Sequence, residues 1–447
     1  MTAIEYAALV DDVAARIMSG ELKPGDRLPP QRAFAYDHGI AASTATRVYS
    51  ELLRRGLVIG EVGRGTFVAR ANHTEAGIRG EPHEGRIDLE FNFPTIASQS
   101  SLISKSLTCL QRPDVMAAAL SPVTNRRIEA ARTAAAAFMV SPDWQPPRDG
   151  FVFTGSGRQS IAAAIAALVP VGGRIGVEAI TYPMIKGIAA RLGVLIVPIG
   201  MDVEGPLPDQ IAKAHRSGAL SAIYIQPALQ NPLGHSISPL RRAELLKITA
   251  KLGLIVIEDI VYGFLADDPP LAALAPDRCI VVDSLSKRIA PGIAVGLLHV
   301  PNVLRDRVAQ TVRTGAWQVS PLGLEAAVRL LSDGTAAQIT QLKRDDARLR
   351  QQIVAKGLPG IDIAADPRAY HAWIRLPAGL RSEAFAAAAL RAGIAITPSS
   401  AFAMAPGHAP NAVRIALGLP THAQLREAMS KLASLLRAGP NDGDVTE

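Results

Sequence analysis

The chain has 447 residues, which is enough for two or three domains. Hydrophobic residues make up 48% of it and charged residues 19%, so the chain can bury sizeable cores and is not a disordered protein. The net charge of +7 permits contact with nucleic acid but does not require it.

Neither a membrane span nor a disulfide framework is expected. No run of 18 apolar residues occurs, and the first residues, "MTAIEYAALVDD", carry acids where a signal peptide needs basic residues. The two cysteines, Cys109 and Cys279, form no paired metal-binding motif. We therefore expect a cytoplasmic protein without a metal site.

Residues 1–69 predict a small helical unit. Apolar residues recur at helical spacing in the first segment. A second helix, "PQRAFAYDH", takes Pro30 in its first turn and ends at Gly39, and a third, "STATRVYSELLRR", turns Val48 and Leu52 inward. Three helices are therefore expected before the pattern changes to short apolar runs.

Two short apolar runs follow the third helix. They are "LVI" (57–59) and "TFV" (66–68), and the glycine-rich turn "GEVGRG" separates them. This pattern predicts a β-hairpin. Together with the three helices it indicates a winged helix-turn-helix.

The motif "LKPGDRLPPQRAFA…TRVYSELLRRGLVIGEVGRGTFV" resembles the N-terminal domain of the GntR family of bacterial regulators. The resemblance implies that the third helix enters the major groove of DNA and that the wing reaches a minor groove. Solvated surface positions are the alternative reading for its arginines. The expected DNA contacts are Arg32, Thr44, Thr46, Arg47 and Arg64.

One departure from the GntR pattern weakens base reading. The family usually has Ser-Arg at the start of the third helix, and Ala41 and Ala42 stand there instead. Residues 1–70 carry nine Lys and Arg against eight Asp and Glu, a net charge of only +1. We expect a dimer to be needed for tight binding to DNA. Residues 70–85 are polar and predict a linker.

From about residue 86, short apolar runs alternate with helical stretches. This alternation predicts an α/β domain with a mostly parallel sheet, in which ligands bind beyond the carboxyl ends of the strands. The runs are "GFVF" (150–153), "RIGVE" (174–178), "VLIVPI" (194–199), "SAIYI" (221–225), "LGLIVIED" (252–259), "CIVVD" (279–283) and "AVGLLHV" (294–300).

Three polar residues at the ends of successive runs point to pyridoxal phosphate. Asn231, Asp259 and Lys287 are spaced 28 residues apart, about the length of one strand-helix unit. An amine at Lys287 could form a Schiff base, and Asp259 could keep the ring nitrogen protonated. A rim lysine without such a role is the alternative reading for Lys287.

Further residues suit the rest of this cofactor. Asn231 and Tyr262 could bond its phenolic oxygen, and Tyr182 could stack on its ring or close a turn. The loop Thr154–Gln159 opens a helix, which favours a phosphate, although such loops are often only turns. The expected phosphate contacts are Gly157, Arg158, Ser284 and Ser286.

Residues 86–437 resemble the class I/II aminotransferases of pyridoxal phosphate fold type I. The motifs are "QNPLG", "IEDIVYGFL", "SLSKRIAPG" and "NAVRIALG". The resemblance implies a smaller C-terminal α+β subdomain, a catalytic role for Lys287 and Asp259, and a substrate carboxylate on Arg414. Residues 438–447 are read as a polar tail.

A GntR domain followed by an aminotransferase-like domain resembles the MocR subfamily. This implies a DNA-binding transcriptional regulator that senses an amino compound, or pyridoxal phosphate itself, through an internal aldimine at Lys287. It also implies a head-to-tail homodimer that binds an operator. The alternatives are an active aminotransferase with an appended DNA-binding domain, and a regulator that uses the cleft for another ligand.

Two departures from the aminotransferase pattern bear on that choice. Ala294 stands where the family has an arginine for the cofactor phosphate, a contact that Arg158 or Arg288 could replace, Arg158 being favoured. The tyrosine that the family donates across the dimer is missing from "ALSPVTNRRIEAARTAAAAF". Both changes put full transamination in doubt.

Overall fold

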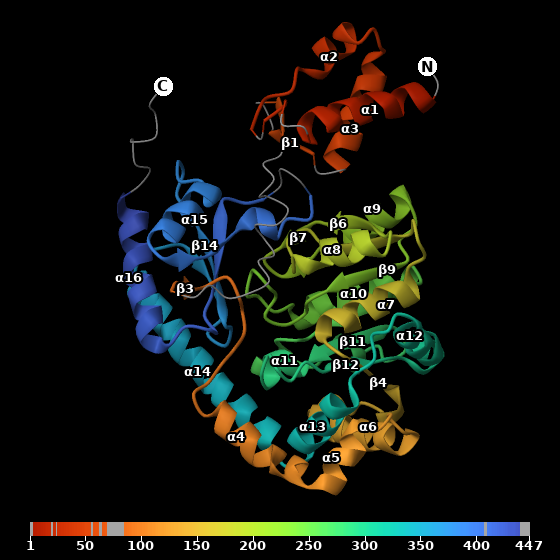
Figure 1. Cartoon of the computed structure of the whole chain (residues 1–447), viewed down its shortest axis with the longest axis vertical. Helices are drawn as coiled ribbons and strands as arrows, with labels where there is room; N and C mark the ends of the chain where they lie inside the picture. The colour runs from red at the N-terminus through yellow and green to blue at the C-terminus, as the bar shows by residue number, and fades with distance from the viewer. Residues whose placement is uncertain are drawn as a thin grey trace. The chain divides into compact units, whose positions relative to one another are not determined.

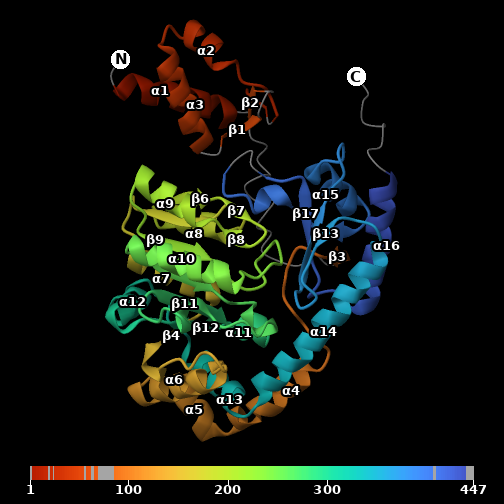
Figure 2. The same cartoon turned by 180° about the vertical axis from the view of Figure 1, so that it is seen from behind.

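The structure, a computed structural model, describes residues 3–18, 21–23, 25–54, 57–61, 65–68, 85–405 and 409–438. The chain forms two compact units, Met1–Pro82 with Ala405–Ala409 and His83–Met404 with Pro410–Glu447. Figures 1 and 2 show the elements of each unit from opposite sides. Among the described helices, none is both long and apolar enough to cross a bilayer.

The small unit has the predicted three helices and hairpin. Its helices are α1 Ala3–Met18, α2 Gln31–Asp37 and α3 Ala42–Arg54. The strands β1 Val58–Glu61 and β2 Gly65–Val68 pair antiparallel, as a wing requires. The two paired strands therefore follow α3 directly in the chain, as in the predicted winged helix-turn-helix.

The core of the small unit explains why the helices lie together. Val48 and Leu52 on α3 are fully buried, as their spacing predicts. The Tyr49 hydroxyl donates to the carbonyl oxygen of Pro29 at 2.6 Å, which ties α3 to the chain before α2. Gly39 takes φ +60, a left-handed conformation that suits glycine after a helix. Pro30 caps α2 in an extended conformation, so the helix begins one residue later than predicted.

A seven-stranded sheet forms the centre of the large unit. Its order is β4-β12-β11-β10-β9-β5-β6. Neighbouring strands run parallel except at β12, which pairs antiparallel with both β11 and β4. Each predicted apolar run overlaps one of the strands, although the runs 150–153 and 279–283 end one residue short. The strands are β4 Phe151–Thr154, β5 Arg174–Glu178, β6 Leu195–Ile199, β9 Ala222–Ile225, β10 Ile255–Asp259, β11 Cys279–Ser284 and β12 Gly296–His299.

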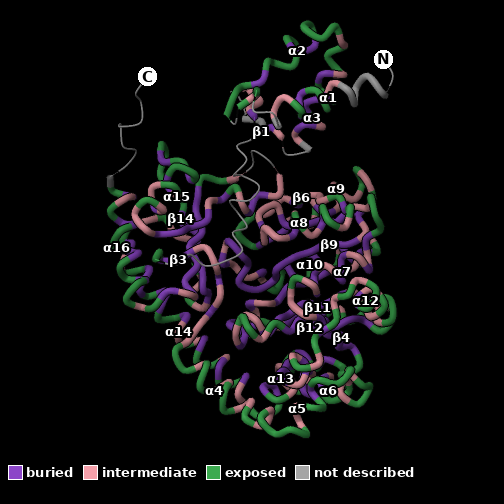
Figure 3. Tube along the Cα trace, in the orientation of Figure 1, coloured by how far each residue is buried: buried purple, intermediate pink, exposed green. Residues whose placement is uncertain are grey.

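Helices cover both faces of this sheet, so its central strands are buried along their length (Figure 3). In β11, Cys279 and Val281 join one apolar core while Ile280 and Val282 join the other, because successive side chains point to opposite faces. One face packs on α7 Gly157–Leu168, α8 Met184–Arg191 and α12 Asn302–Thr314. The other packs on α6 Asn125–Met139, α9 Pro208–Ser217, α10 Pro239–Lys251 and α13 Pro321–Ser332.

A smaller α+β subdomain follows the sheet, as predicted. Its four-stranded sheet has the order β13-β14-β17-β16, and the long helix α14 Thr335–Gly357 shares its core. Its elements are β13 Ile363–Ala364, β14 His371–Arg375, α15 Ser382–Arg391, β15 Ile394–Ala395, β16 Thr397–Pro398, β17 Ala412–Ala416 and α16 His422–Ala438.

The start of the large unit joins this subdomain. β3 Ile87–Asp88 pairs in parallel with β15, more than 300 positions later in the chain, which fixes the segment that follows β3. The other short elements are α4 Gln99–Ser106, η1 Leu107–Gln111, α5 Pro113–Leu120, η2 Arg148–Gly150, β7 Met201–Asp202, β8 Gly205–Pro206, η3 Gly263–Leu265, η4 Leu271–Ala273, α11 Leu285–Arg288 and η5 Ser399–Ala401.

Candidate functional site

Lys287 lies in the one-turn helix α11, which begins where β11 ends. Its amine donates to the carbonyl oxygen of Asn92 at 2.6 Å and lies 3.5 Å from the centre of the Phe93 ring. The Tyr262 hydroxyl donates to the same carbonyl at 3.3 Å. Lys287 and Tyr262 therefore converge on one backbone oxygen.

Sequence reasoning missed Asn92 and Phe93. They lie just after β3, and the Asp88 side chain accepts hydrogen bonds from the amides of Glu90 and Phe91, which folds this segment back on itself. Only the distant pairing of β3 with β15 brings it to Lys287. No local motif in the segment signals this role.

The environment of Lys287 favours a reactive amine. Burial lowers its pKa to about 7, and the positive charges of Arg414, Arg158 and Lys343 act in the same direction, while Asp259 opposes them. A neutral amine is the nucleophilic form. An ordinary lysine is almost wholly protonated at pH 7, so this shift prepares Lys287 for attack on a carbonyl carbon.

Asp259 ends β10, the strand next to β11. One carboxylate oxygen accepts a hydrogen bond from the Tyr224 hydroxyl at 2.6 Å, and the other accepts one from the Val261 amide at 3.1 Å. Burial raises the pKa of Asp259 to about 6, and these two hydrogen bonds oppose the rise. Tyr224, on the adjoining β9, is a residue that sequence reasoning missed because it reads as an apolar strand position.

Asn231 and Arg414 meet beside this pair. The Arg414 guanidinium donates to the Asn231 side-chain oxygen at 3.3 Å, to the Thr397 hydroxyl at 3.0 Å and to the carbonyl oxygen of Glu90. Its Nε atom is buried and has no hydrogen-bond partner within the described chain. A buried guanidinium with a free donor suits a carboxylate.

Tyr182 follows β5 and is half-buried against the core that contains α7 and α8. Burial raises its pKa to about 12, and Arg158, Asp259 and Arg414 all act on its hydroxyl electrostatically. Tyr182 therefore belongs to the same cluster as Lys287 and Asp259.

The predicted phosphate loop lies at the start of α7. Ser156 caps the helix and accepts a hydrogen bond from the Gln159 amide at 3.3 Å. A Cβ atom on Gly157 would lie 2.9 Å from the Cβ of Ser284, so only glycine allows this close approach of α7 to the end of β11. Ser284 is buried there and caps α11, and Ser286 is half-buried.

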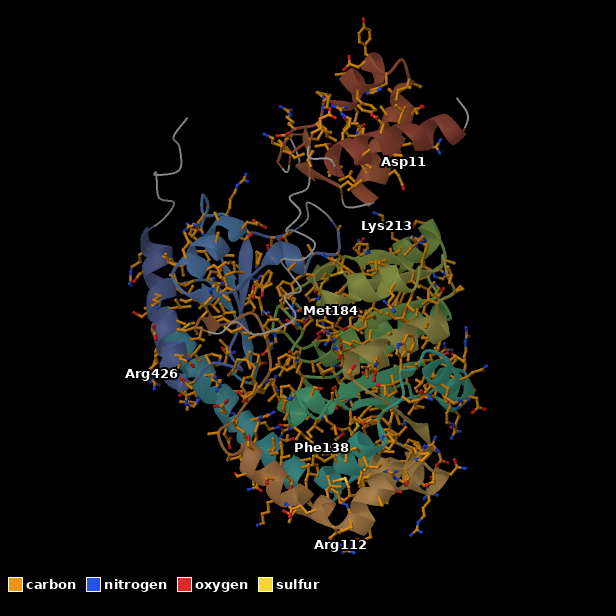
Figure 4. The ribbon with its side chains drawn as sticks, in the orientation of Figure 1. Asp11, Arg112, Phe138, Met184, Lys213 and Arg426 are labelled. Atoms are coloured by element: carbon orange, nitrogen blue, oxygen red, sulfur yellow. The ribbon has the colours of Figure 1, made fainter. Side chains whose placement is uncertain are left out.

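The two arginines considered for the phosphate have different surroundings. Arg288 is buried, forms an ion pair with Asp283 at 2.6 Å, and stacks near Phe138, whose position Figure 4 labels. Arg158 is exposed at the start of α7 and forms no ion pair with another described residue. Ala294 is also exposed. Of the two arginines, Arg158 is the one left available to an anion.

The DNA-contact candidates lie on α2 and α3. Arg32, Thr46 and Arg47 are exposed, and Thr44 is half-buried. The Thr46 hydroxyl on α3 donates to the side-chain oxygen of Gln31 on α2 at 2.9 Å, and this contact links the two helices. The same hydroxyl also lies within hydrogen-bond distance of the Ala42 carbonyl in its own helix. Thr46 thus has a structural contact as well as an exposed position. Arg64 and residues 70–84 of the predicted linker lie outside the described residues.

The residues of the large unit fit pyridoxal phosphate. An amine, a carboxyl group, a guanidinium with a free donor and a glycine-lined helix start converge at one edge of the sheet. The acid ends β10 and the amine lies just after the neighbouring strand β11, so the sheet brings the two side chains to the same region. In the described part of the chain, no group of three His, Cys, Asp or Glu side chains could hold a metal ion.

Comparison with known families assigns the class of protein. Residues 116–432 match the class I and II aminotransferases, and the chain belongs to this family. Residues 5–68 match the gntR family of bacterial regulatory proteins. The joining of these two domains defines a helix-turn-helix transcriptional regulator of the MocR type, which confirms the family and fold predicted from the sequence.

Curated relatives share this layout over nearly their full length. The uncharacterized HTH-type transcriptional regulator YdeF of Bacillus subtilis is 27% identical over 96% of this chain and 94% of its own. The vitamin B6 salvage pathway transcriptional repressor PtsJ of Salmonella typhimurium is 24% identical over 90% of this chain and 92% of its own. Among solved structures, an archaeal alanine:glyoxylate aminotransferase superposes with a TM-score of 0.72, at 22% identity, over 82% of this chain and 93% of its own, which supports the fold.

Proposed function

We propose that the protein binds pyridoxal phosphate through Lys287 and that an amino compound, or the cofactor itself, controls its binding to promoter DNA. The observation that carries the proposal is that Asp259 and Arg414 both lie close enough to the buried Lys287 amine to act on its charge, while the Arg414 Nε is buried without a hydrogen-bond partner in the described chain. A helix-turn-helix domain lies on the same chain, so ligand binding could change the affinity of the protein for DNA.

Each residue has a role in this proposal. Lys287 holds the cofactor covalently, and Asp259 holds a proton on the ring nitrogen. Asn231 and Tyr262 orient the phenolic oxygen, and Tyr182 covers the ring. Bound there, pyridoxal phosphate supplies an electrophilic carbon and an electron-withdrawing ring. The phosphate contacts are Gly157, Arg158, Ser284 and Ser286.

Arg414 defines the class of effector in this proposal. Its buried guanidinium favours a ligand that carries a carboxylate, while Lys287 requires a ligand with an amine. An amino acid satisfies both conditions. Ligand binding alters the regulator only if the two DNA-binding states differ in affinity for the ligand.

In this proposal the small unit contacts DNA, and two copies of the chain assemble to bind it. We assign contacts to Arg32, Thr44, Thr46, Arg47 and Arg64. The low net charge of this unit favours a dimer, because two copies double the number of phosphate contacts. A head-to-tail homodimer is the arrangement that we propose, and a regulator of bacterial promoters acts in the cytoplasm.

The direct test is Lys287→Ala. The wild-type protein should turn yellow with pyridoxal phosphate, and borohydride should fix the cofactor on the peptide that contains Lys287. The variant should stay colourless and should not respond to the cofactor in a DNA-retardation assay. The matched control is Lys186→Ala. Burial also lowers the pKa of Lys186, but its amine donates to the carbonyl of Ala401 and has no assigned contact with the cofactor. Unchanged colour in Lys287→Ala would refute the assignment.

The DNA interface has its own test. Arg64→Ala should weaken operator binding and reduce the slope of log affinity against log salt by about 1, as expected for one lost phosphate contact. Arg112→Ala is a suitable control, because Arg112 is an exposed arginine of the large unit that pairs only with Asp114 in the described contacts. An unaltered slope in Arg64→Ala would remove the wing from the interface.

An active aminotransferase is the second candidate. The observation that favours it is that Lys287, Asp259 and Arg414 are all present and close to one another. Sustained conversion of an amino donor and a 2-oxo acceptor would establish this activity. Ala294 argues against it, because one strong phosphate contact is missing.

A further inference from the structure

We propose that Lys343 is a positioning residue for Lys287, a role that rests on the proposed use of Lys287 as the cofactor amine. Lys343 lies on α14 and its side chain is fully buried. Its amine donates to the carbonyl oxygen of Lys287 at 2.9 Å and to that of Ile289 at 2.8 Å. One lysine thus holds the backbone from which the other projects.

The short length of α11 makes such support necessary. The helix has a single turn, Leu285–Arg288, so the carbonyl groups at its end have no partner further along the helix. Buried carbonyls without a donor destabilise a fold by an amount similar to a lost hydrogen bond. Lys343 supplies a donor to one of them, the carbonyl of Lys287, and to the carbonyl of Ile289 directly after the helix, which fixes the backbone at Lys287 itself.

Lys343 is in turn anchored to the C-terminal subdomain. The Tyr370 hydroxyl lies 2.9 Å from the Lys343 carbonyl oxygen and 2.7 Å from the Asp346 carboxylate. Asp346 also accepts from Arg350 at 2.5 Å and contacts the ring of His422 at 2.7 Å. The position of Lys343 therefore also depends on contacts that Lys343 and Asp346, three residues apart on one face of α14, make with Tyr370 and His422.

The charge of Lys343 also acts on the Lys287 amine. The other charged groups that face this amine are Arg414, Arg158 and Asp259, and the first two act in the same direction as Lys343. Burial lowers the pKa of Lys343 itself to about 7, and Asp346 opposes this effect. Removal of the Lys343 charge should raise the pKa of Lys287, since an ammonium next to fewer positive charges is easier to maintain.

The test is Lys343→Met in the full-length apo-protein. Competitive labelling of Lys287 with acetic anhydride across a pH series, read by peptide mass spectrometry, measures the pKa and reactivity of this amine without any cofactor. The pKa of Lys287 should rise by roughly 0.5 to 1 unit, and labelling at pH 7 should slow by about 2- to 6-fold, because the neutral fraction of the amine starts near one half. Lys343→Arg, which keeps the charge and the donors, should restore the wild-type profile in large part.

The matched control is Gln351→Met. Gln351 is buried on the same helix and donates to two backbone carbonyls, those of Ala369 at 2.7 Å and His371 at 3.0 Å. Its loss should lower the thermal stability as a buried hydrogen-bond donor does, but it should leave the Lys287 labelling profile unchanged. An identical profile in Lys343→Met and wild type, or an equal shift in Gln351→Met, would overturn the positioning role.

Two further measurements keep the test decisive. If Lys343→Met does not fold, Lys343→Gln retains two N–H donors without the charge and should give the same upward shift in the pKa of Lys287. Binding of pyridoxal phosphate to wild type is measured in parallel. Absence of binding with a low Lys287 pKa that depends on Lys343 would refute the proposed function but support the positioning role, whereas binding with no Lys343 dependence would refute the positioning role alone.

Discussion

The amine end and the phosphate end of the candidate site differ in how far the protein organises them. Around Lys287 and Asp259, groups from α11, from the segment after β3 and from the strands β9 and β10 make short hydrogen bonds at 2.6 Å. At the start of α7, Arg158 is exposed, and Ala294, between α11 and β12, offers no polar side chain. Under the proposed function, covalent attachment and ring contacts, rather than phosphate charge pairing, should therefore dominate the retention of pyridoxal phosphate.

Breaking the amine end should have the largest effect. Asp259→Ala removes the carboxyl group that would hold the ring proton, and it leaves the Tyr224 hydroxyl without its partner. We expect the affinity for pyridoxal phosphate to fall by about 100-fold or more, since a charge-assisted hydrogen bond and a buried partner are lost together. A spectrophotometric titration measures this change. A wild-type affinity would show that the ring nitrogen has another partner.

Rebuilding the phosphate end should reverse the asymmetry. Ala294→Arg restores the arginine that the family usually has, and one charge-assisted bidentate contact should tighten binding by roughly 10-fold. Arg158→Ala should weaken binding by a similar factor. Equilibrium dialysis with pyridoxal phosphate measures both, and unphosphorylated pyridoxal, which should not distinguish the variants, serves as the control. No change in either variant would mean that the phosphate lies elsewhere.

The pH dependence should report on the amine end alone. Because burial lowers the pKa of Lys287 to about 7, the reactive neutral form is gained as the pH rises through 7 and is nearly complete about one unit above. Stopped-flow rates of cofactor attachment should therefore rise about 10-fold per pH unit below the pKa of Lys287. The rates should level off above roughly pH 8. A rate that keeps rising to pH 10 would indicate an ordinary lysine.

The smallest effect should come from crowding the phosphate loop. Gly157→Ala places a methyl group 2.9 Å from the Cβ of Ser284, so α7 must shift at a cost of about 1 to 3 kcal/mol. The affinity for pyridoxal phosphate should fall by only about 2- to 5-fold. The control is Gly187→Ala in α8, where no atom lies within 4 Å of the added Cβ. Differential scanning calorimetry measures stability, and equal stability in both variants would contradict the tight approach.

Local sequence patterns were sufficient for much of the fold. All seven apolar runs overlap strands of the central sheet, and the signal is clearest in strands buried on both faces, such as β9 and β11. The inward positions Val48 and Leu52 are buried because helical spacing places them on one face. The start of α2 was misplaced by one residue, since Pro30 fits both a cap and a first turn.

The sequence by itself determined which chemistry-bearing residues end the strands, since Asn231, Asp259 and Lys287 each follow an apolar run at a repeating interval. The tertiary structure alone decided what surrounds them. Asn92 reaches Lys287 from 195 residues away, and Lys343 supports it from 56 residues away. Neither contact has a local signal, because each depends on how distant elements pack, whereas strand and helix patterns depend on the side chains of neighbouring residues.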